Sequence, residues 1–192
     1  LPNDSETLPT VTAKIINLSI GAYLSGTTDP HVEPALQAAR EKGIIIVASA
    51  GNERMAPYNE VEVAYPASSI HTIAVAASTA PVLVDGFPII APYSNPGTLV
   101  DITAPGGLGD DSNSWYDWVV TATRDTDSET AENPEGYAYG GVVGTSIAAP
   151  HVSGLLALLC TVDDFMNLDT AMLVLSRSAM DLGSPGWDQD FG

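Results

Sequence analysis

The chain has 192 residues, a length that usually forms one domain with a sizeable hydrophobic core. Its 24 acidic residues against 6 lysines and arginines give a formal net charge of −18, and 45% of its residues are apolar. This charge argues against nucleic acid or an anionic membrane as a partner, because both attract basic residues. The apolar fraction excludes a disordered acidic tail, and the single Cys160 excludes an internal disulfide. No apolar run reaches the roughly 20 residues that a membrane helix needs.

The first half of the sequence predicts a strand, a helix and a second strand in succession. Residues 1–12 are polar and contain proline, which is typical of a loop or linker, so we place the domain at 13–192. The β-branched run 13–20 predicts a strand. Asp29 and Pro30 resemble the cap and first turn of a helix that ends near Lys42. The apolar run 44–48 then fits a strand that is covered on both faces, as in a parallel sheet.

The second half continues the same alternation. We expect strands at 72–77, 98–102 and 118–121, and helices at 145–160 and 169–180. The polar segment 124–136 is interpreted as a surface excursion. Together these elements predict an α/β protein with a mainly parallel sheet.

Two segments have an unusual sequence. Residues 48–53 follow the predicted strand at 44–48, and residues 144–154 begin the predicted helix at 145–160. A serine at a helix start, such as Ser146, is most often a cap, and an asparagine after a strand, such as Asn52, is most often a turn former. A helix start also offers free backbone N–H groups that suit a developing oxyanion. We expect Pro150 to be tolerated because it lies near the first turn, where its missing N–H has no intrahelical partner.

The segment Gly144-Thr145-Ser146-Ile147-Ala148-Ala149-Pro150-His151-Val152-Ser153-Gly154 closely resembles the nucleophile motif of the subtilisin-like serine proteases. Four more blocks resemble that family in the right order, at 15–21, 47–53, 64–67 and 100–106. The resemblance implies a three-layer α/β fold with a mainly parallel sheet flanked by helices. It also implies that the N-terminal third of the catalytic domain is missing, since the chain starts after the family's first motifs.

The resemblance assigns roles to residues of these blocks. Ser146 is the implied nucleophile of a serine endopeptidase that acts through an acyl-enzyme. The Asn52 side chain and the Ser146 backbone N–H are the implied oxyanion hole, and Thr145 supports it. The Tyr65-Pro66 peptide bond is expected to be cis.

The same resemblance implies a substrate cleft on two segments. Ser19, Ile20 and Gly21 are expected to pair with the substrate backbone as a strand. Ser49, Ala50 and Gly51 are expected to wall the first specificity pocket and to leave room for a large side chain. Glu53, at the far end of that pocket, is expected to accept a basic side chain.

A general base and an orienting acid are missing from these blocks. The family carries them on two earlier motifs that do not occur in this chain, and His31, His71 and His151 are interpreted as ordinary histidines. We therefore expect a segment outside this chain, or a companion chain, to supply both groups. The alternative is an inactive fragment or pseudoenzyme that acts as a peptide-binding or structural module.

The resemblance also bears on ions and location. No cofactor is required, but Asp101 with the carbonyls of Ala67, Ser69 and Thr72 is a candidate site for a structural Ca²⁺ or Na⁺ ion. A solvated aspartate is the alternative, and the acidic run 125–129 is interpreted as a solvated loop. The expected partners are a protein or peptide substrate and a propeptide. Secretion as a zymogen agrees with the family and with the acidity.

Overall fold

The computed structural model describes residues 13–24, 28–55, 62–79, 87–109, 118–124, 130, 133, 135–164 and 166–192. Its main element is a parallel sheet with the strand order β1-β2-β3-β4. These strands are β1 (Ile15–Leu18), β2 (Ile45–Ser49), β3 (Ile73–Ser78) and β4 (Ile102–Pro105). Three helices accompany the sheet, namely α1 (Glu33–Glu41), α2 (Thr145–Cys160) and α3 (Leu168–Ser178).

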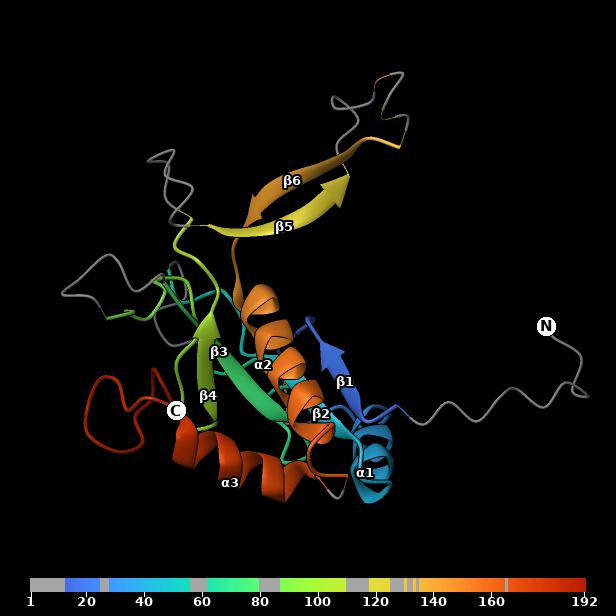
Figure 1. Ribbon diagram of the computed structural model, residues 1–192. Helices are drawn as coiled ribbons and strands as arrows, with labels where there is room; N and C mark the ends of the chain where they lie inside the picture. Colours follow the sequence, from blue (N-terminus) through green and yellow to red (C-terminus); the bar gives the residue numbers. More distant parts are fainter. Residues whose placement is uncertain are drawn as a thin grey trace, which may run out of the picture.

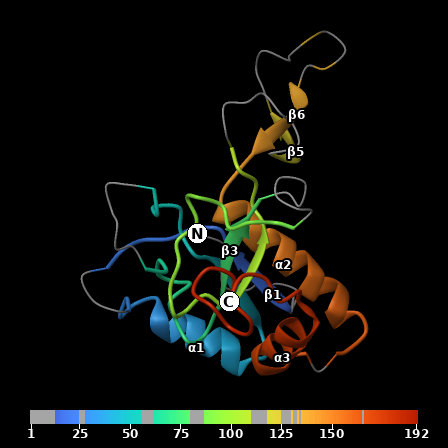
Figure 2. The same ribbon diagram turned by 90° about the vertical axis from the view of Figure 1, so that its left-hand side faces the viewer.

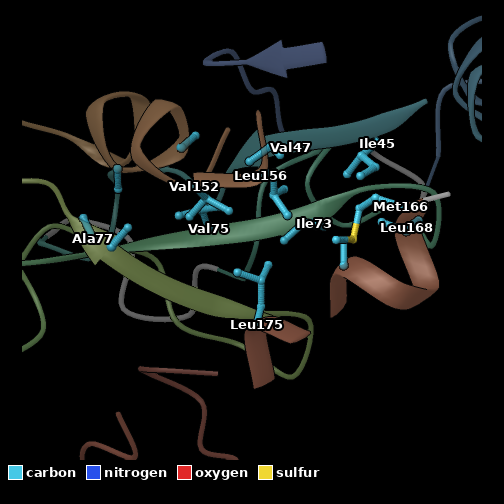
Figure 3. Packing of buried hydrophobic residues seen from close by; sticks show 14 of the residues in the cluster. Ile45, Val47, Ile73, Val75, Ala77, Val152, Leu156, Met166, Leu168 and Leu175 are labelled. Carbon is cyan, nitrogen blue, oxygen red and sulfur yellow. The ribbon is translucent and has the colours of Figure 1, made fainter. Parts of the chain in front are cut away.

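The sheet lies between two layers of other elements, as Figure 1 shows for the helices. One face packs against α2 and α3, and Figure 3 shows Val47 and Val75 of the sheet near Val152 and Leu156 of α2. The opposite face packs against α1 and the loops that follow β2 and precede β4. The predicted three-layer α/β fold is therefore confirmed.

The inner strand β2 is buried along its whole length. All five of its residues are buried, because alternate side chains point to the α2 face and to the α1 face. Each fully buried aliphatic side chain of this kind contributes about 1.5–3 kcal/mol relative to an exposed one. The continuous apolar run in the sequence follows directly from this two-sided cover.

The register of the sheet sets the position of the candidate site. Leu18 at the end of β1 pairs with Ala48 of β2, and Ser49 pairs with Val75 of β3. The chain therefore leaves β1 and β2 at the same edge, so residues 19–21 and 49–51 lie beside each other there. Ligands of open parallel sheets bind outside this carboxyl edge.

A second, two-stranded sheet stands away from the body of the molecule in both views (Figures 1 and 2). It is an antiparallel hairpin of β5 (Val119–Arg124) and β6 (Tyr137–Val142). The prediction of a strand at 118–121 is confirmed, but β6 was not expected, because its glycines and exposed tyrosines resemble a loop. The surface excursion at 124–136 has only a few described residues, and its acidic run 125–129 lies outside them.

Two local predictions are wrong. Helix α1 begins at Glu33 rather than at Asp29, because Asp29 and Pro30 form a preceding turn in which Asp29 Oδ1 accepts the N–H groups of His31 and Val32 at 2.7 and 3.1 Å. Strand β4 begins at Ile102, where the expected strand 98–102 ends. The loop predicted at 1–12 lies outside the described residues, so it stays a prediction.

The position of Pro150 also differs from expectation. It lies inside α2, where its missing N–H leaves the carbonyl of Ser146 without its usual partner four residues later. In the described part of the chain, no helix has the length and apolar character that crossing a membrane requires.

Candidate active site

The start of α2 is built around Gly144. This residue has φ +136°, a conformation that glycine adopts without a steric cost, and its N–H donates to Gly106 O at 2.9 Å and to Tyr93 Oη at 3.0 Å. Ser146 is the second residue of the helix, so its backbone N–H has no acceptor one turn earlier. The N-terminal end of the helix therefore presents Ser146 together with a free donor and the positive end of the helix dipole.

Ser146 is hydrogen-bonded to Ser19, the residue that follows the carboxyl end of β1. The Ser19 hydroxyl donates to the Ser146 carbonyl at 2.6 Å, which satisfies the acceptor that Pro150 leaves free. In return, Ser146 Oγ lies 3.5 Å from the Ser19 carbonyl oxygen. Ser19 itself is held by Asn17, whose side chain donates to its hydroxyl at 2.9 Å. Half-buried Ser146 thus lies next to the segment that was expected to bind the substrate backbone.

Asn52 is oriented by Thr145. Its amide oxygen accepts the backbone N–H and the hydroxyl of Thr145, both at 2.9 Å. A backbone N–H can only donate, so the acceptor must be Oδ1, and Nδ2 faces the opposite way. The described residues offer Nδ2 no acceptor, while the fully buried Thr145 hydroxyl also accepts Gly51 N–H at 3.1 Å. The site therefore holds two free donors, Asn52 Nδ2 and Ser146 N–H, at the start of one helix.

A buried residue that sequence reasoning missed holds the Asn52 loop in place. Asn95 has no exposed surface, and its Oδ1 accepts Glu53 N–H at 2.8 Å while its Nδ2 donates to Ala50 O at 3.1 Å. Its own N–H donates to Gly51 O at 3.0 Å. The local sequence Asn95-Pro96-Gly97 is typical of a turn, and no local pattern indicates a contact with residues more than 40 positions earlier.

The two segments expected to form the substrate cleft follow neighbouring strands at the carboxyl edge of the sheet. Ser49 and Ala50 are buried, whereas Ile20 is 64% exposed and available to a ligand. Glu53 does not extend freely into the cleft. Its Oε2 accepts Asn52 N–H at 2.7 Å and Asn95 Nδ2 at 3.1 Å, and it also contacts the Tyr23 hydroxyl.

The three histidines are engaged elsewhere. His151 Nδ1 pairs with Ile147 O at 2.9 Å, and His71 Nε2 lies 3.7 Å from Glu33 Oε1. His31 is exposed in the turn before α1. Within the described residues none of them forms a hydrogen bond with Ser146, so this part of the chain provides no general base to the serine.

Asp101 lies apart from this site, in a cavity of about 250 Å³ that Ala67, Ser69 and Thr72 also line. Burial raises the pKa of its carboxyl to about 6, although Oδ2 accepts Ala74 N–H at 2.8 Å. The carbonyls of Ala67 and Ser69 converge on Thr72 Oγ1, at 3.1 and 3.0 Å. A desolvated carboxylate beside carbonyl oxygens is a donor set that fits Ca²⁺ or Na⁺. The described residues contain no cluster of three or more acidic, histidine or cysteine side chains.

The cis bond expected at Tyr65-Pro66 is confirmed. It precedes the segment that carries Ala67 and Ser69, so the predicted block at 64–67 lies beside the Asp101 cavity.

Comparison with known proteins agrees with this geometry. The profile of the Subtilase family (Peptidase_S8) matches residues 8–192. The "Thermophilic serine proteinase" of Bacillus sp. (strain AK1) is 38% identical over 149 residues, which are 78% of this chain and 28% of that protein. An "Extracellular protease" of Xanthomonas campestris pv. campestris is 31% identical over 150 residues, which are 78% of this chain and 21% of that protein.

Among solved structures, fervidolysin from Fervidobacterium pennivorans, described as a keratinolytic enzyme related to subtilisin, superposes with a TM-score of 0.74. The identity is 28%, and the match covers 94% of this chain and 25% of fervidolysin. The fold, the nucleophile motif and these similarities define one class of protein, the subtilisin-like serine proteases. The chain belongs to the subtilase family, and it spans less than a third of the length of each of these relatives.

Proposed function

We propose that this chain is the nucleophile-bearing part of a serine endopeptidase, with Ser146 forming the acyl-enzyme. The observation that carries the proposal is the arrangement at the start of α2, where the Ser146 hydroxyl lies beside two free donors, its own N–H and Asn52 Nδ2. Thr145 and Asn95 hold the asparagine loop before any ligand binds, so these donors need no reorganisation in the reaction.

In this mechanism Ser146 Oγ forms a bond with the carbonyl carbon of the scissile peptide, and its proton passes to a general base. The charge that develops on the carbonyl oxygen is stabilised by Asn52 Nδ2 and Ser146 N–H, each contributing about 3 kcal/mol. The C–N bond then breaks as the base returns its proton to the leaving amine. Water attacks the resulting ester in the same way and restores the Ser146 hydroxyl.

The general base and its orienting acid are proposed to come from a segment outside this chain. This part of the proposal is supported by the positions of the three histidines, which pair with other residues or lie on the surface. The same observation supports the second candidate, a non-catalytic module that binds an extended peptide along residues 19–21. The two candidates differ in whether a base ever reaches Ser146.

Two serines on α2 allow a controlled test. The protein as purified from its source is assayed on unfolded casein, together with Ser146→Ala and Ser153→Ala. Ser153 lies on the same helix, but its hydroxyl is bonded to Asn17 Oδ1 and Ala149 O. We expect Ser146→Ala to abolish cleavage and Ser153→Ala to keep most of it. Equal activity of all three proteins contradicts the endopeptidase, and a folded wild type that binds casein without cleaving it supports the binding module.

Location and ion binding complete the proposal. Secretion is supported by the strongly acidic composition and by the relative that is named an extracellular protease. A Ca²⁺ or Na⁺ ion held by Asp101 and neighbouring carbonyls is supported by the largely buried carboxylate in that cavity, which accepts one backbone N–H from Ala74. The ion would offset the buried charge and stabilise the fold; it takes no part in the reaction at Ser146.

A further inference from the structure

The space beside Ser146 is bounded by two chain segments. Ser146 Oγ lies against the Ser19 carbonyl, at the edge where the chain leaves β1 and β2. The family resemblance implies that residues 19–21 pair with the substrate backbone and that residues 49–51 wall the first specificity pocket, so we take the side chain before the scissile bond to lie between residues 19–23 and residues 49–53. Small residues on the second segment, Ala50 and Gly51, would leave room there for a large group if nothing else entered the space.

The side chain of Tyr23 occupies part of this space. Ala22 pairs with Tyr65 in both directions, with N–H···O distances of 2.8 and 3.0 Å, so the backbone before Tyr23 is anchored. The Tyr23 hydroxyl hydrogen-bonds Glu53 Oε2 and accepts from Asn95 Nδ2 across the gap between the two segments. The Tyr23 oxygen lies 2.8 Å from the position that a Cβ on Gly51 would take. The ring thus bridges from the first segment to the wall formed by the second.

The contact with Tyr23 also limits the ability of the Glu53 carboxylate to bind a basic substrate side chain. Besides Tyr23, its Oε2 accepts Asn52 N–H and Asn95 Nδ2, so three donors surround one carboxylate oxygen. Burial, followed by the hydrogen bond to Glu53, raises the pKa of Tyr23, so the hydroxyl keeps its proton and the bond near neutral pH. A basic substrate side chain that approached Glu53 would have to displace a tyrosine already bonded to it.

We propose that Tyr23 is a specificity-determining residue, which closes the pocket next to Ser146 and restricts cleavage to peptide bonds that follow a small side chain. This inference rests on the proposed function and refines it. The sequence predicted a roomy pocket with Glu53 exposed at its far end. The inference instead describes a shorter pocket in which Tyr23 covers Glu53. Removal of the ring would restore both features, because Gly51 and the Glu53 carboxylate lie directly behind it.

The test uses four peptide amides of a chromogenic amine that differ only in the residue before the scissile bond, which is Ala, Leu, Phe or Lys. Cleavage by the protein as purified is compared with Tyr23→Ala, Tyr23→Phe and Tyr23→Ala combined with Glu53→Gln. Tyr137→Ala is the matched control, since Tyr137 is 70% exposed on the hairpin. A fluorophosphonate that labels Ser146 counts the active sites in each preparation.

We expect the wild type and Tyr137→Ala to prefer Ala over Phe and Lys. Tyr23→Ala is expected to raise kcat/KM for Phe and Lys at least tenfold, which corresponds to about 1.4 kcal/mol, while kcat/KM for Ala changes by less than about threefold. Tyr23→Phe keeps the ring and is expected to keep rejecting Phe. The additional Glu53→Gln change is expected to remove the gain for Lys alone.

Other outcomes overturn the inference in distinguishable ways. A wild type that already prefers Phe, or a Tyr23→Ala protein that loses activity on all four peptides in proportion, leaves the endopeptidase intact and contradicts the role of Tyr23. If Tyr23→Ala does not fold, Tyr23→Leu, which keeps apolar bulk without a ring, must widen the pocket for Phe relative to Ala. Absence of both labelling and cleavage in the wild type contradicts the proposed function itself.

Discussion

The start of α2 and the β5–β6 hairpin follow each other in the sequence, yet they are held in different ways. Thr145 has no exposed surface and bonds to Asn52 and Gly51, residues that lie about 90 positions earlier. Tyr137 and Tyr139 on the hairpin are 70% and 79% exposed, and the hairpin is held by its own ladder. The start of α2, which carries the proposed nucleophile Ser146, is thus fixed by long-range contacts, whereas the neighbouring hairpin is organised locally.

This difference has a functional meaning. A reaction that depends on donors at fixed positions needs a rigid frame, and the buried sheet provides it through β1, β2 and the helix that crosses them (Figure 1). Among the described residues, the hairpin meets that frame at its base, where Val119, Val142 and Ile147 line a cavity of about 300 Å³. Changes in the frame should therefore affect stability and catalysis, whereas changes on the outer hairpin should affect neither strongly.

The largest effect is expected for Leu156→Ala. Leu156 is fully buried between α2 and the sheet, where Figure 3 shows it near Val47 and Val75. Its truncation leaves a cavity and should lower the free energy of unfolding by about 2–5 kcal/mol, measured by urea denaturation. Leu158→Ala on the exposed side of the same helix is the control, and an equal loss in both variants would contradict the packing described here.

Thr145→Val is expected to weaken catalysis as well as stability. Valine preserves the shape but removes the hydroxyl that accepts Gly51 N–H and donates to Asn52 Oδ1. The loss of a buried partner should cost about 1–3 kcal/mol of stability, and kcat should fall about 10- to 100-fold with little change in KM. Thr145→Ser keeps the hydroxyl and should restore kcat. If kcat falls as much in Thr145→Ser as in Thr145→Val, the methyl group of Thr145 matters rather than its hydroxyl.

Asp101→Asn tests the candidate ion site in the frame. An ion bound at the carboxylate should raise the melting temperature of the wild type by a few degrees in millimolar Ca²⁺ or higher Na⁺, because it offsets a buried charge. The variant should not respond to either ion. Asp169→Asn is the control, since Asp169 lines the same cavity but is paired with Arg40 at 2.8 Å. An ion response that survives in Asp101→Asn places the ion elsewhere.

The smallest effect is expected for Tyr139→Ser on the hairpin. The side chain is largely exposed, and its backbone pairs with Ala122 whatever residue it carries. The free energy of unfolding should change by no more than about 0.5 kcal/mol, and casein cleavage should be unchanged. A loss comparable with that of Thr145→Val would mean that the hairpin belongs to the rigid frame, and the distinction between the two regions would fail.

The elements that could be predicted from sequence are those whose own residues carry the signal. The run 44–48 is apolar throughout because β2 is covered on both faces, and the motif at 144–154 carries its own glycine, serine and proline. Strand β6 was missed because none of its residues is buried and two of its six are glycines. Its pairing with β5 is a property of the tertiary structure that its composition does not indicate.

The residues of the candidate site likewise fall into those that a local pattern predicts and those that it does not. Ser146 and Asn52 lie in motifs with a recognisable local pattern, and the structure brings them together through Thr145. Tyr23 and Asn95 act through contacts with residues 30 to 45 positions away, so no window of sequence contains both partners. The pocket was expected to be roomy because its walls are small, and Tyr23, which we propose closes it, comes from another segment.

The central claim is that Ser146 is the nucleophile of an acyl-transfer reaction. It is tested most directly by the intact mass of the protein as purified from its source, before and after a fluorophosphonate, with peptide mapping of any adduct. We predict one adduct per molecule, located on Ser146, and none on a chain of residues 1–192 alone, because none of the described histidines bonds to the serine. An unmodified Ser146 in the purified protein, or an adduct on another residue, would contradict the claim.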